Sequence, residues 1–453
     1  MKTLARLLCF LMILQPLTIL AEENYTFELS EIEKKPYSLG GYVEFQPILF
    51  GLDKDASLYK LRFHSKSEGD TVEENKTTLQ LDGGYEKGIA RLYTKVNLEA
   101  EESFQGWSDE AKFYEGYLSL KPSSSFNLDF GKKTVNWGKG YAWNPAAFID
   151  RVRDPDDPQL AREGFVVASA DYIKSFQGNL KTLSLTSLLI PVYEDVNNDF
   201  GKTKHLNLAG KIYFLLYDTD IDFMFLAGAS KANRYGMDFS RNITSNFEVH
   251  GEFAFIEDFE KKFTDQNGFV SSREYNATSF LLGLRYLTRN DITFIFEYYN
   301  NGTGFTPSEI RDYFSFVNTG YDNFISTGNN SSLKKASVLA GGSYNRKNPM
   351  RDYFYFRISQ KEPFEILYFT PAVTCIYNAN DRSFSLSPEL LYTGITNFEL
   401  RAKSGILIGE RNSEYGEKQN DYRIELRLRY YFDALKLLNR AVSKMNRSDN
   451  KKL

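Results

Sequence analysis

The chain has 453 residues, and its 55 lysines and arginines against 59 acidic residues give a formal net charge of −4. That balance provides no basic field for a nucleic acid, and a mean hydropathy of −0.42 excludes a bundle of membrane-spanning helices. Phenylalanine and tyrosine are abundant, at 37 and 30 residues, which suits long amphipathic strands.

Residues 1–21 have the layout of a secretory signal peptide. Basic residues precede an apolar run that ends at Ala21, and this run is shorter than a spanning helix requires. We therefore expect a signal peptide over residues 1–21 and a periplasmic lead over residues 22–36, with an uncleaved membrane anchor as the alternative. Beyond the signal Cys375 is the one cysteine, so no intramolecular disulfide is expected.

Polar and apolar residues alternate along most of residues 37–432. Alternation with a period of two gives a strand one polar and one apolar face. Charges at every second position, over many strands, require water on one side of the sheet. The charged residues that we expect to line a lumen are Arg91, Lys95, Glu99, Glu248, Glu252, Arg401, Arg423, Glu425, Arg427 and Arg429.

The connections between the expected strands alternate between short and long. Residues 86–88 form a tight link, whereas residues 101–109, 258–276 and 301–351 form longer ones. A soluble sandwich or propeller would also place polar residues outside, but this alternation is typical of outer-membrane barrels. Seventeen strands from Thr78 onward, plus one strand with an irregular lead over residues 37–66, predict an all-β, antiparallel, up-and-down transmembrane β-barrel of about 18 strands, within a range of 16 to 20.

The stretch from Phe126 to Gly164 begins as a strand and continues into a charged, aromatic connection. Glycines around Trp137 allow unusual backbone angles, and the step to Pro145 turns the chain out of the strand. The connection could fold inward as a constriction, with its arginines opposite its aspartates, or lie outside as a solvated loop. The constriction candidates are Trp137, Trp143, Asp150, Arg151, Arg153, Asp154 and Arg162.

Two other segments carry local signals. Thr306 to Glu309 is a capping box with proline at the first helical position, which predicts a short helix within residues 301–351. That helix could act as a lid or plug, or it could be a surface excursion. Residues 433–453 form a basic tail with apolar residues at helical spacing.

Enzymatic motifs are absent from the sequence. Beyond the signal the histidines are His64, His205 and His250, and no H-E-x-x-H, C-x-x-C or G-x-S-x-G occurs. A calcium site built from Asp154, Asp156 and Asp157 lacks EF-hand spacing. We expect no enzyme, cofactor or metal, although a serine and a histidine from separate strands could still meet in the fold.

The signal peptide, the amphipathic strands and a final strand that ends in Tyr430, Tyr431 and Phe432 together resemble Gram-negative outer-membrane porins and alginate-export-type barrels. A second stretch is similar to uncharacterised porin-like barrels in its G-x-x-x-x-x-W-G strand and N-P turn. Its residues are Gly131, Trp137, Gly138, Asn144 and Pro145. The resemblance implies a location in the bacterial outer membrane, contact with its lipid, and recognition of Phe432 by the barrel-assembly machinery. The tail beyond Phe432 departs from that pattern.

The predicted function is a porin-like channel that passes small or anionic and polar solutes through a charged lumen. The alternative is a plugged or structural barrel that presents its loops to a surface polymer or a partner protein. The sequence leaves open whether the protein forms a homo-oligomer.

Overall fold

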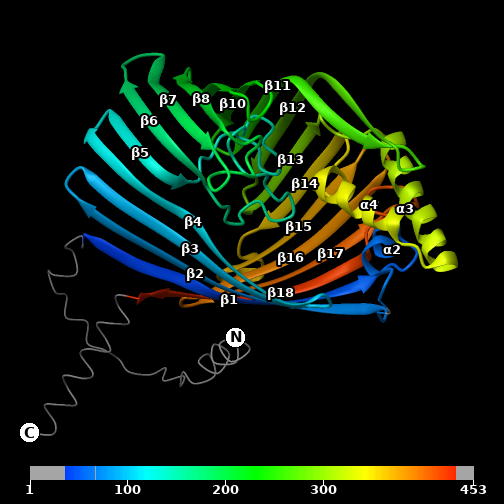
Figure 1. Ribbon diagram of the computed structural model, residues 1–453. Coiled ribbons are helices and arrows are strands. Elements are labelled where there is room, and N and C mark those ends of the chain that lie inside the picture. Colours follow the sequence, from blue (N-terminus) through cyan, green and yellow to red (C-terminus); the bar gives the residue numbers. More distant parts are fainter. Residues whose placement is uncertain (1–35, 67, 435–453) are drawn as a thin grey trace, which may run out of the picture.

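The computed structural model describes residues 36–66 and 68–434, and within them the chain forms one closed antiparallel sheet of 18 strands (Figure 1). The first strand, β1 (Tyr37–Leu52), pairs with β2 (Thr71–Lys87) on one side and with β18 (Asn420–Asp433) on the other. Every other strand pairs with its neighbours in the chain. The predicted antiparallel barrel is therefore confirmed, while the expected signal peptide and nearly all of the basic tail lie outside the described residues.

The remaining strands follow in chain order. They are β3 (Ala90–Ser103), β4 (Gly106–Ser123), β5 (Phe126–Lys133), β6 (Phe165–Ser175), β7 (Leu180–Val192), β8 (His205–Leu216), β9 (Thr219–Ala227), β10 (Arg234–Thr244), β11 (Phe247–Thr264), β12 (Val270–Leu287), β13 (Ile292–Asn300), β14 (Asp352–Gln360), β15 (Phe369–Asn378), β16 (Ser383–Ile395) and β17 (Phe398–Ile408).

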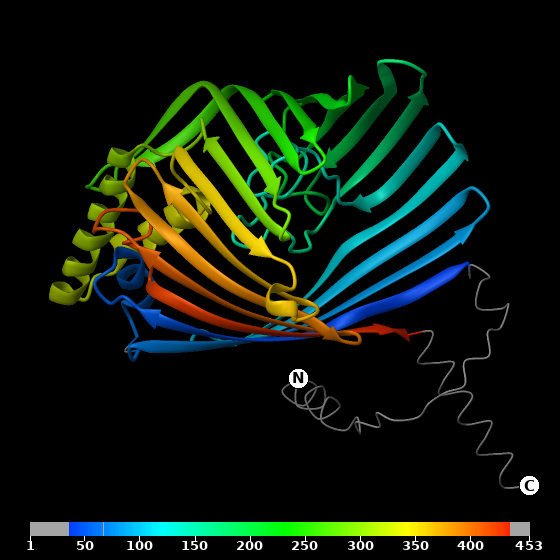
Figure 2. The same ribbon diagram turned by 180° about the vertical axis from the view of Figure 1, so that it is seen from behind.

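The two ends of the barrel differ. The end that holds the start of β1 and the finish of β18 carries mostly tight turns, and the opposite end carries the helices (Figure 2). The helices there are α2 (Ser57–Phe63), α3 (Pro307–Thr327) and α4 (Ser331–Leu339). None of the helices in the described part of the chain is long and apolar enough to cross a membrane.

Three expected connections differ from those observed. The irregular part of residues 37–66 follows its strand, as α2, and does not precede it. Residues 101–109 are no long loop, because β3 and β4 continue through them and leave a two-residue link at 104–105. Likewise β11 and β12 extend into residues 258–276. In the last two cases, charged residues on strands that run past the apolar zone were mistaken for a loop.

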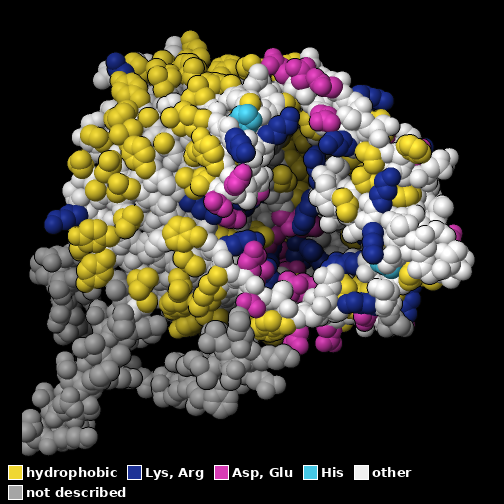
Figure 3. All heavy atoms as spheres, viewed as in Figure 1, with side chains coloured by type: hydrophobic (Ala, Val, Ile, Leu, Met, Phe, Trp, Pro, Cys, Tyr) yellow, Lys and Arg dark blue, Asp and Glu magenta, His cyan; other side chains and the backbone are white. Residues whose placement is uncertain are grey.

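The outer wall of the barrel is apolar and the interior is charged. On β18, Ile424 and Leu426 point outward and are 53% and 37% exposed, while Glu425 and Arg427, which alternate with them, are buried inside. Figure 3 shows yellow side chains over the outer wall and dark blue and magenta side chains around the hollow. An apolar outer belt of this kind suits contact with lipid acyl chains.

The predicted helix exists and is longer than expected. Thr306 caps α3, because its hydroxyl accepts a hydrogen bond from Glu309 N while Glu309 Oε2 accepts one from Thr306 N at 2.8 Å. The helix ends at Gly328 in a left-handed conformation. Its apolar face, which includes Ile310 and Phe314, is buried. We call residues 301–351, which contain α3 and α4, the helical insertion.

Candidate functional site

Residues 134–164, between β5 and β6, lie inside the barrel, and we call them the inner loop (Figure 1). Glycine is required at the first bend of this loop. Gly138 has φ of +90°, and a β-carbon there would come within 2.7 Å of the side chains of Asn144 and Glu252. The segment therefore approaches the β11 wall more closely than any other residue type would allow.

Glu252 on β11 holds the bend of the inner loop. Its carboxylate accepts hydrogen bonds from the backbone nitrogens of Lys139 at 2.6 Å, Gly140 at 2.7 Å and Ala146 at 3.1 Å. The Asn144 side chain donates a fourth, at 2.9 Å. The side chain of Glu252 is buried, so this carboxylate replaces water for four donors of the loop.

A second wall carboxylate, Glu297 on β13, binds the next turn of the inner loop. It accepts hydrogen bonds from the backbone nitrogens of Tyr141 and Ala142, the latter at 2.9 Å. The ring nitrogen Nε2 of His250 lies 3.0 Å from the same carboxylate. Both His250 and Glu297 are buried, so this histidine helps to position the carboxylate that binds the inner loop.

The two tryptophans of the inner loop pack into apolar clusters and do not line an opening. Trp143 stacks on Tyr299 with ring centroids 5.2 Å apart, and its indole nitrogen donates to Asn348 of the helical insertion at 3.1 Å. Trp137 is buried in another cluster with Phe148, against β6 to β11. These two constriction candidates therefore fix the loop in place.

The arginines of the inner loop bind the loop itself. Arg153 donates to the carbonyl oxygens of Gly140 and Tyr141 at 2.6 and 2.9 Å, and Arg162 donates to that of Arg151 at 2.8 Å. Arg151 forms ion pairs with Glu163 and Asp199. Arg153 and Arg162 also lie near the loop acid Asp150, but their hydrogen bonds to backbone carbonyls were not foreseeable from sequence spacing.

Asp150 is a buried acceptor within the same loop. Its carboxylate accepts a hydrogen bond from Trp137 N at 2.9 Å. Burial raises the pKa of Asp150 from its ordinary 3.8 to about 6, although that hydrogen bond and nearby arginines oppose the shift.

The tip of the inner loop brings its acidic residues to the opposite wall. Asp157 accepts hydrogen bonds from Arg401 on β17 at 3.0 Å and from Arg427 on β18 at 2.9 Å. Burial alone would raise the pKa of the Asp157 carboxyl, but the two arginines outweigh burial and lower it. Arg401 also donates to Glu389 on β16 at 2.8 Å. Loop acids and wall arginines thus form one charge network.

The flanks of the tip are held by lysines. Asp154 forms an ion pair with Lys347 of the helical insertion, and Lys403 on β17 donates to the carbonyl oxygen of Asp156 at 2.5 Å. No group of three or more metal-ligating side chains that could hold an ion occurs among the described residues.

The other expected lumen residues lie on the polar face of their strands. Lys95 pairs with Glu115 at 3.0 Å and Glu99 with Lys76 at 2.7 Å. Arg91 is exposed close to the β2–β3 turn, over the ring of Tyr93. The remaining placements are Glu248 beside Tyr141, Arg423 beside Asp156, Glu425 beside Arg427, and Arg429 beside Glu44.

Three acids that the structure places at the centre of these networks were not selected from the sequence, namely Glu44, Glu297 and Glu389. Glu44 was detectable, because it alternates with Val43 and Phe45 on a strand. The roles of the other two depend on partners in other elements of the fold.

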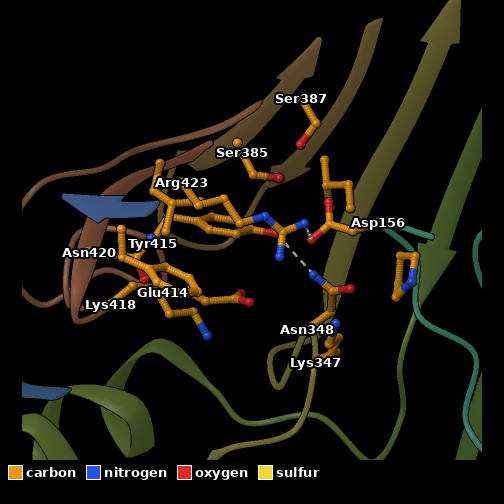
Figure 4. A pocket seen from close by; sticks show the side chains of 15 residues that line it. Asp156, Lys347, Asn348, Ser385, Ser387, Glu414, Tyr415, Lys418, Asn420 and Arg423 are labelled. Carbon is orange, nitrogen blue, oxygen red and sulfur yellow. Dashed lines mark hydrogen bonds and ion pairs between the residues drawn. The ribbon is translucent and has the colours of Figure 1, made fainter. Parts of the chain in front are cut away.

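Two cavities adjoin the tip of the inner loop. One of about 370 Å³ lies against the β1–β3 and β18 wall, and its lining includes Glu44, Gln80, Glu99, Asp157 and Arg427. The other, of about 190 Å³, is shown in Figure 4, where Arg423 and Asp156 point toward one another. Their charged atoms are 3.9 Å apart. Ser385, Ser387 and Lys418 also line this smaller cavity.

Comparisons with known proteins identify the fold. No family model and no curated protein matches the chain. Among solved structures, Acinetobacter baumannii OccAB1 matches with a TM-score of 0.54 and 8% identity, over 87% of this chain and 96% of that one. Pseudomonas aeruginosa OccK9 (OpdG) matches with a TM-score of 0.52 and 10% identity, over 87% and 98%.

Those similarities concern the fold. The cellular location is inferred from the architecture of the barrel. Closed antiparallel barrels with an apolar outer belt and a polar interior are built for the bacterial outer membrane. The chain therefore has the fold of an outer-membrane β-barrel.

Proposed function

We propose that the chain is a channel for small polar solutes, which the inner loop narrows at mid-lumen. The observation that carries this proposal is the charge network across the lumen, in which Asp157 faces Arg401 and Arg427. A passage lined on one side by acids and on the other by arginines sets a field across the path of a solute. The cavity of about 370 Å³ beside that network is the space in which a solute would meet it.

The lining includes both signs of charge. Glu44, Glu99 and Asp157 contribute carboxylates, while Arg423 and Arg427 contribute guanidinium groups. Most of these charges are already paired within the wall, for example Glu44 with Arg429 at 2.7 Å. A paired lining favours polar solutes in general over one strongly selected ion, so we propose weak selectivity.

Planar-bilayer recording tests the proposal. Purified, folded protein should give stepwise conductance in potassium chloride, and the same protein boiled before addition should give none. A folded barrel migrates differently on a gel before and after boiling, so folding is checked on the same sample. Folded protein that inserts into the bilayer without conductance would refute the channel.

A plugged barrel is the second candidate, and one observation favours it. An apolar cluster joins Trp143 of the inner loop, Tyr353 and Tyr355 of β14, and Phe314 and Leu333 of the helical insertion, and it fills that side of the interior. Under this alternative the intact protein is closed. A protease site placed at Gly328–Asn329, between α3 and α4, distinguishes the two, because cutting there should open a plugged barrel and leave an open channel's conductance nearly unchanged.

Three finer expectations stay proposals from the sequence. The residues on the polar strand faces line the solute path, the closing strand is recognised by the barrel-assembly machinery, and the subtype is close to alginate-export barrels. Cross-linking in native membranes would also test a homo-oligomer.

A further inference from the structure

Two arginines near the helix-bearing end of the lumen lack a counter-charge. Arg234 is the first residue of β10, and Arg346 follows the π-helical turn η2 (Ala340–Tyr344) of the helical insertion. Neither side chain has a hydrogen bond or an ion pair with another described residue, and Arg234 Nε is buried without a partner. Elsewhere in the lumen, wall arginines such as Arg401 and Arg427 are paired with carboxylates.

The backbone explains why Arg234 is held inside. Its neighbours across the sheet, Leu226 and Ile256, are buried apolar residues on the inner face. The stem of Arg234 therefore lies among apolar groups that seal Nε, while its terminal nitrogens remain open. Arg346 is exposed and interacts electrostatically with Tyr299, which stacks on Trp143 of the inner loop.

A third cation joins this pair. The charge of Arg346 acts repulsively on Arg234, and that of Arg234 acts on Lys231 in the link before β10. Burial, and after it the neighbouring arginine, lowers the pKa of Lys231 to about 7. The acid that attracts Lys231 is Asp199, which is already paired with Arg151. Lys231 and Arg234 are three residues apart and Arg346 belongs to the helical insertion, so three cations from two segments share no carboxylate of their own.

We propose that Lys231, Arg234 and Arg346 form a binding site for a phosphate-type oxyanion at the helix-bearing mouth of the lumen. Like charges held close together without an anion destabilise a fold, and a bound anion removes that cost. A carboxylate presents two oxygens in one plane and is matched by a single guanidinium. Three cationic donors from two segments are better satisfied by the several oxygens of a tetrahedral group with more than one negative charge. Basic and acidic side chains both surround the hollow on the face seen in Figure 3.

This inference does not depend on conduction. Inorganic phosphate and a phosphorylated sugar share the recognised chemistry, so both are used as probes, with acetate as the planar comparison. Titration calorimetry on folded protein in detergent should show saturable phosphate binding. R234Q and R346Q should each weaken it by about tenfold or more, as expected for a lost charge-assisted hydrogen bond. R382Q, which neutralises an exposed arginine in the link between β15 and β16, is the matched control and should leave it unchanged.

Proton uptake provides a second measurement on the same site. An anion bound beside Lys231 favours its charged form, so phosphate binding at pH 8 should take up protons, and K231M should abolish that uptake. Tighter binding of the sugar phosphate would identify a phosphorylated solute as the ligand class, and equal binding would identify the phosphate group alone.

The proposed oxyanion site and the proposed channel function can be refuted independently of each other. Absence of saturable phosphate binding by folded protein, acetate binding as tight as phosphate binding, or an equal loss in R382Q would overturn the oxyanion site while conductance persisted. Phosphate binding that depends on Arg234 and Arg346 in a barrel without conductance would support the site and reject the channel.

Discussion

Replacing Glu252 with alanine should release the inner loop while leaving the barrel closed. The carboxylate accepts four hydrogen bonds from the loop, between 2.6 and 3.1 Å, and is buried. Each such bond contributes about 1 kcal/mol net, so its removal should cost the inward position of the loop about 4 kcal/mol. The strand pairing of β11 with β10 and β12 does not involve this side chain.

Hydrogen exchange measures that cost directly. About 4 kcal/mol corresponds to roughly a thousandfold loss of protection when exchange occurs by local opening. The loss should be confined to the amides of the inner loop, including Lys139, Gly140 and Ala146. If the loop also narrows the lumen, single-channel conductance should rise in the same variant.

Glu248→Ala is the matched control for this experiment. Glu248 lies four residues before Glu252 on the same face of β11, but its contacts with Ser240 and Tyr141 are longer, at 3.2 and 3.3 Å. We expect E248A to change loop protection by tenfold at most. The reasoning is refuted if the inner-loop amides of E252A keep their protection, or if E248A and E252A behave alike.

Three further changes test other parts of the structure. Leu426→Arg should destabilise the folded barrel by about 2 to 4 kcal/mol if the residue lies near the bilayer midplane; a urea midpoint equal to that of the unmodified protein would contradict its outward position. Asp157→Asn removes one negative charge from beside the wall arginines Arg401 and Arg427, so the reversal potential in a salt gradient should shift toward anion preference, and a shift toward cations would contradict the network. Because the pKa of Asp150 is raised, its share of loop stability is full at pH values below 4 and is lost as pH rises to about 6. Asp150→Asn should flatten that part of the proteolysis profile of the inner loop, and an unchanged profile would assign the pH dependence to another group.

Local patterns predicted the wall of the barrel well. Period-two alternation is a property of each strand alone, so Ile424 and Leu426 could be assigned to the outside before any neighbour was known. The capping box at Thr306 acts within one turn, and it predicted the start of α3 for the same reason.

The anchors of the inner loop could not be predicted in this way. Glu252 meets Gly140 across 112 residues of sequence, and no local signal shows that a strand carboxylate will serve backbone amides. The partners of the loop arginines could not be predicted for a similar reason. Many of these partners are backbone carbonyl groups, which every residue carries. The overestimated link at residues 101–109 has another cause: strands that extend beyond lipid lose the apolar half of their pattern.

The seam between β1 and β18 has a consequence for biogenesis. Tyr42 lies opposite Tyr431, so the earliest strand to leave the ribosome waits for the latest before its hydrogen bonds are complete. Neighbouring strands such as β8 and β9 need close only a two-residue turn, and short closures are fast and entropically cheap. Hairpins should therefore form first. The two edge strands of the nascent sheet then carry unpaired backbone hydrogen-bonding groups, which must be protected from other chains until β1 pairs with β18.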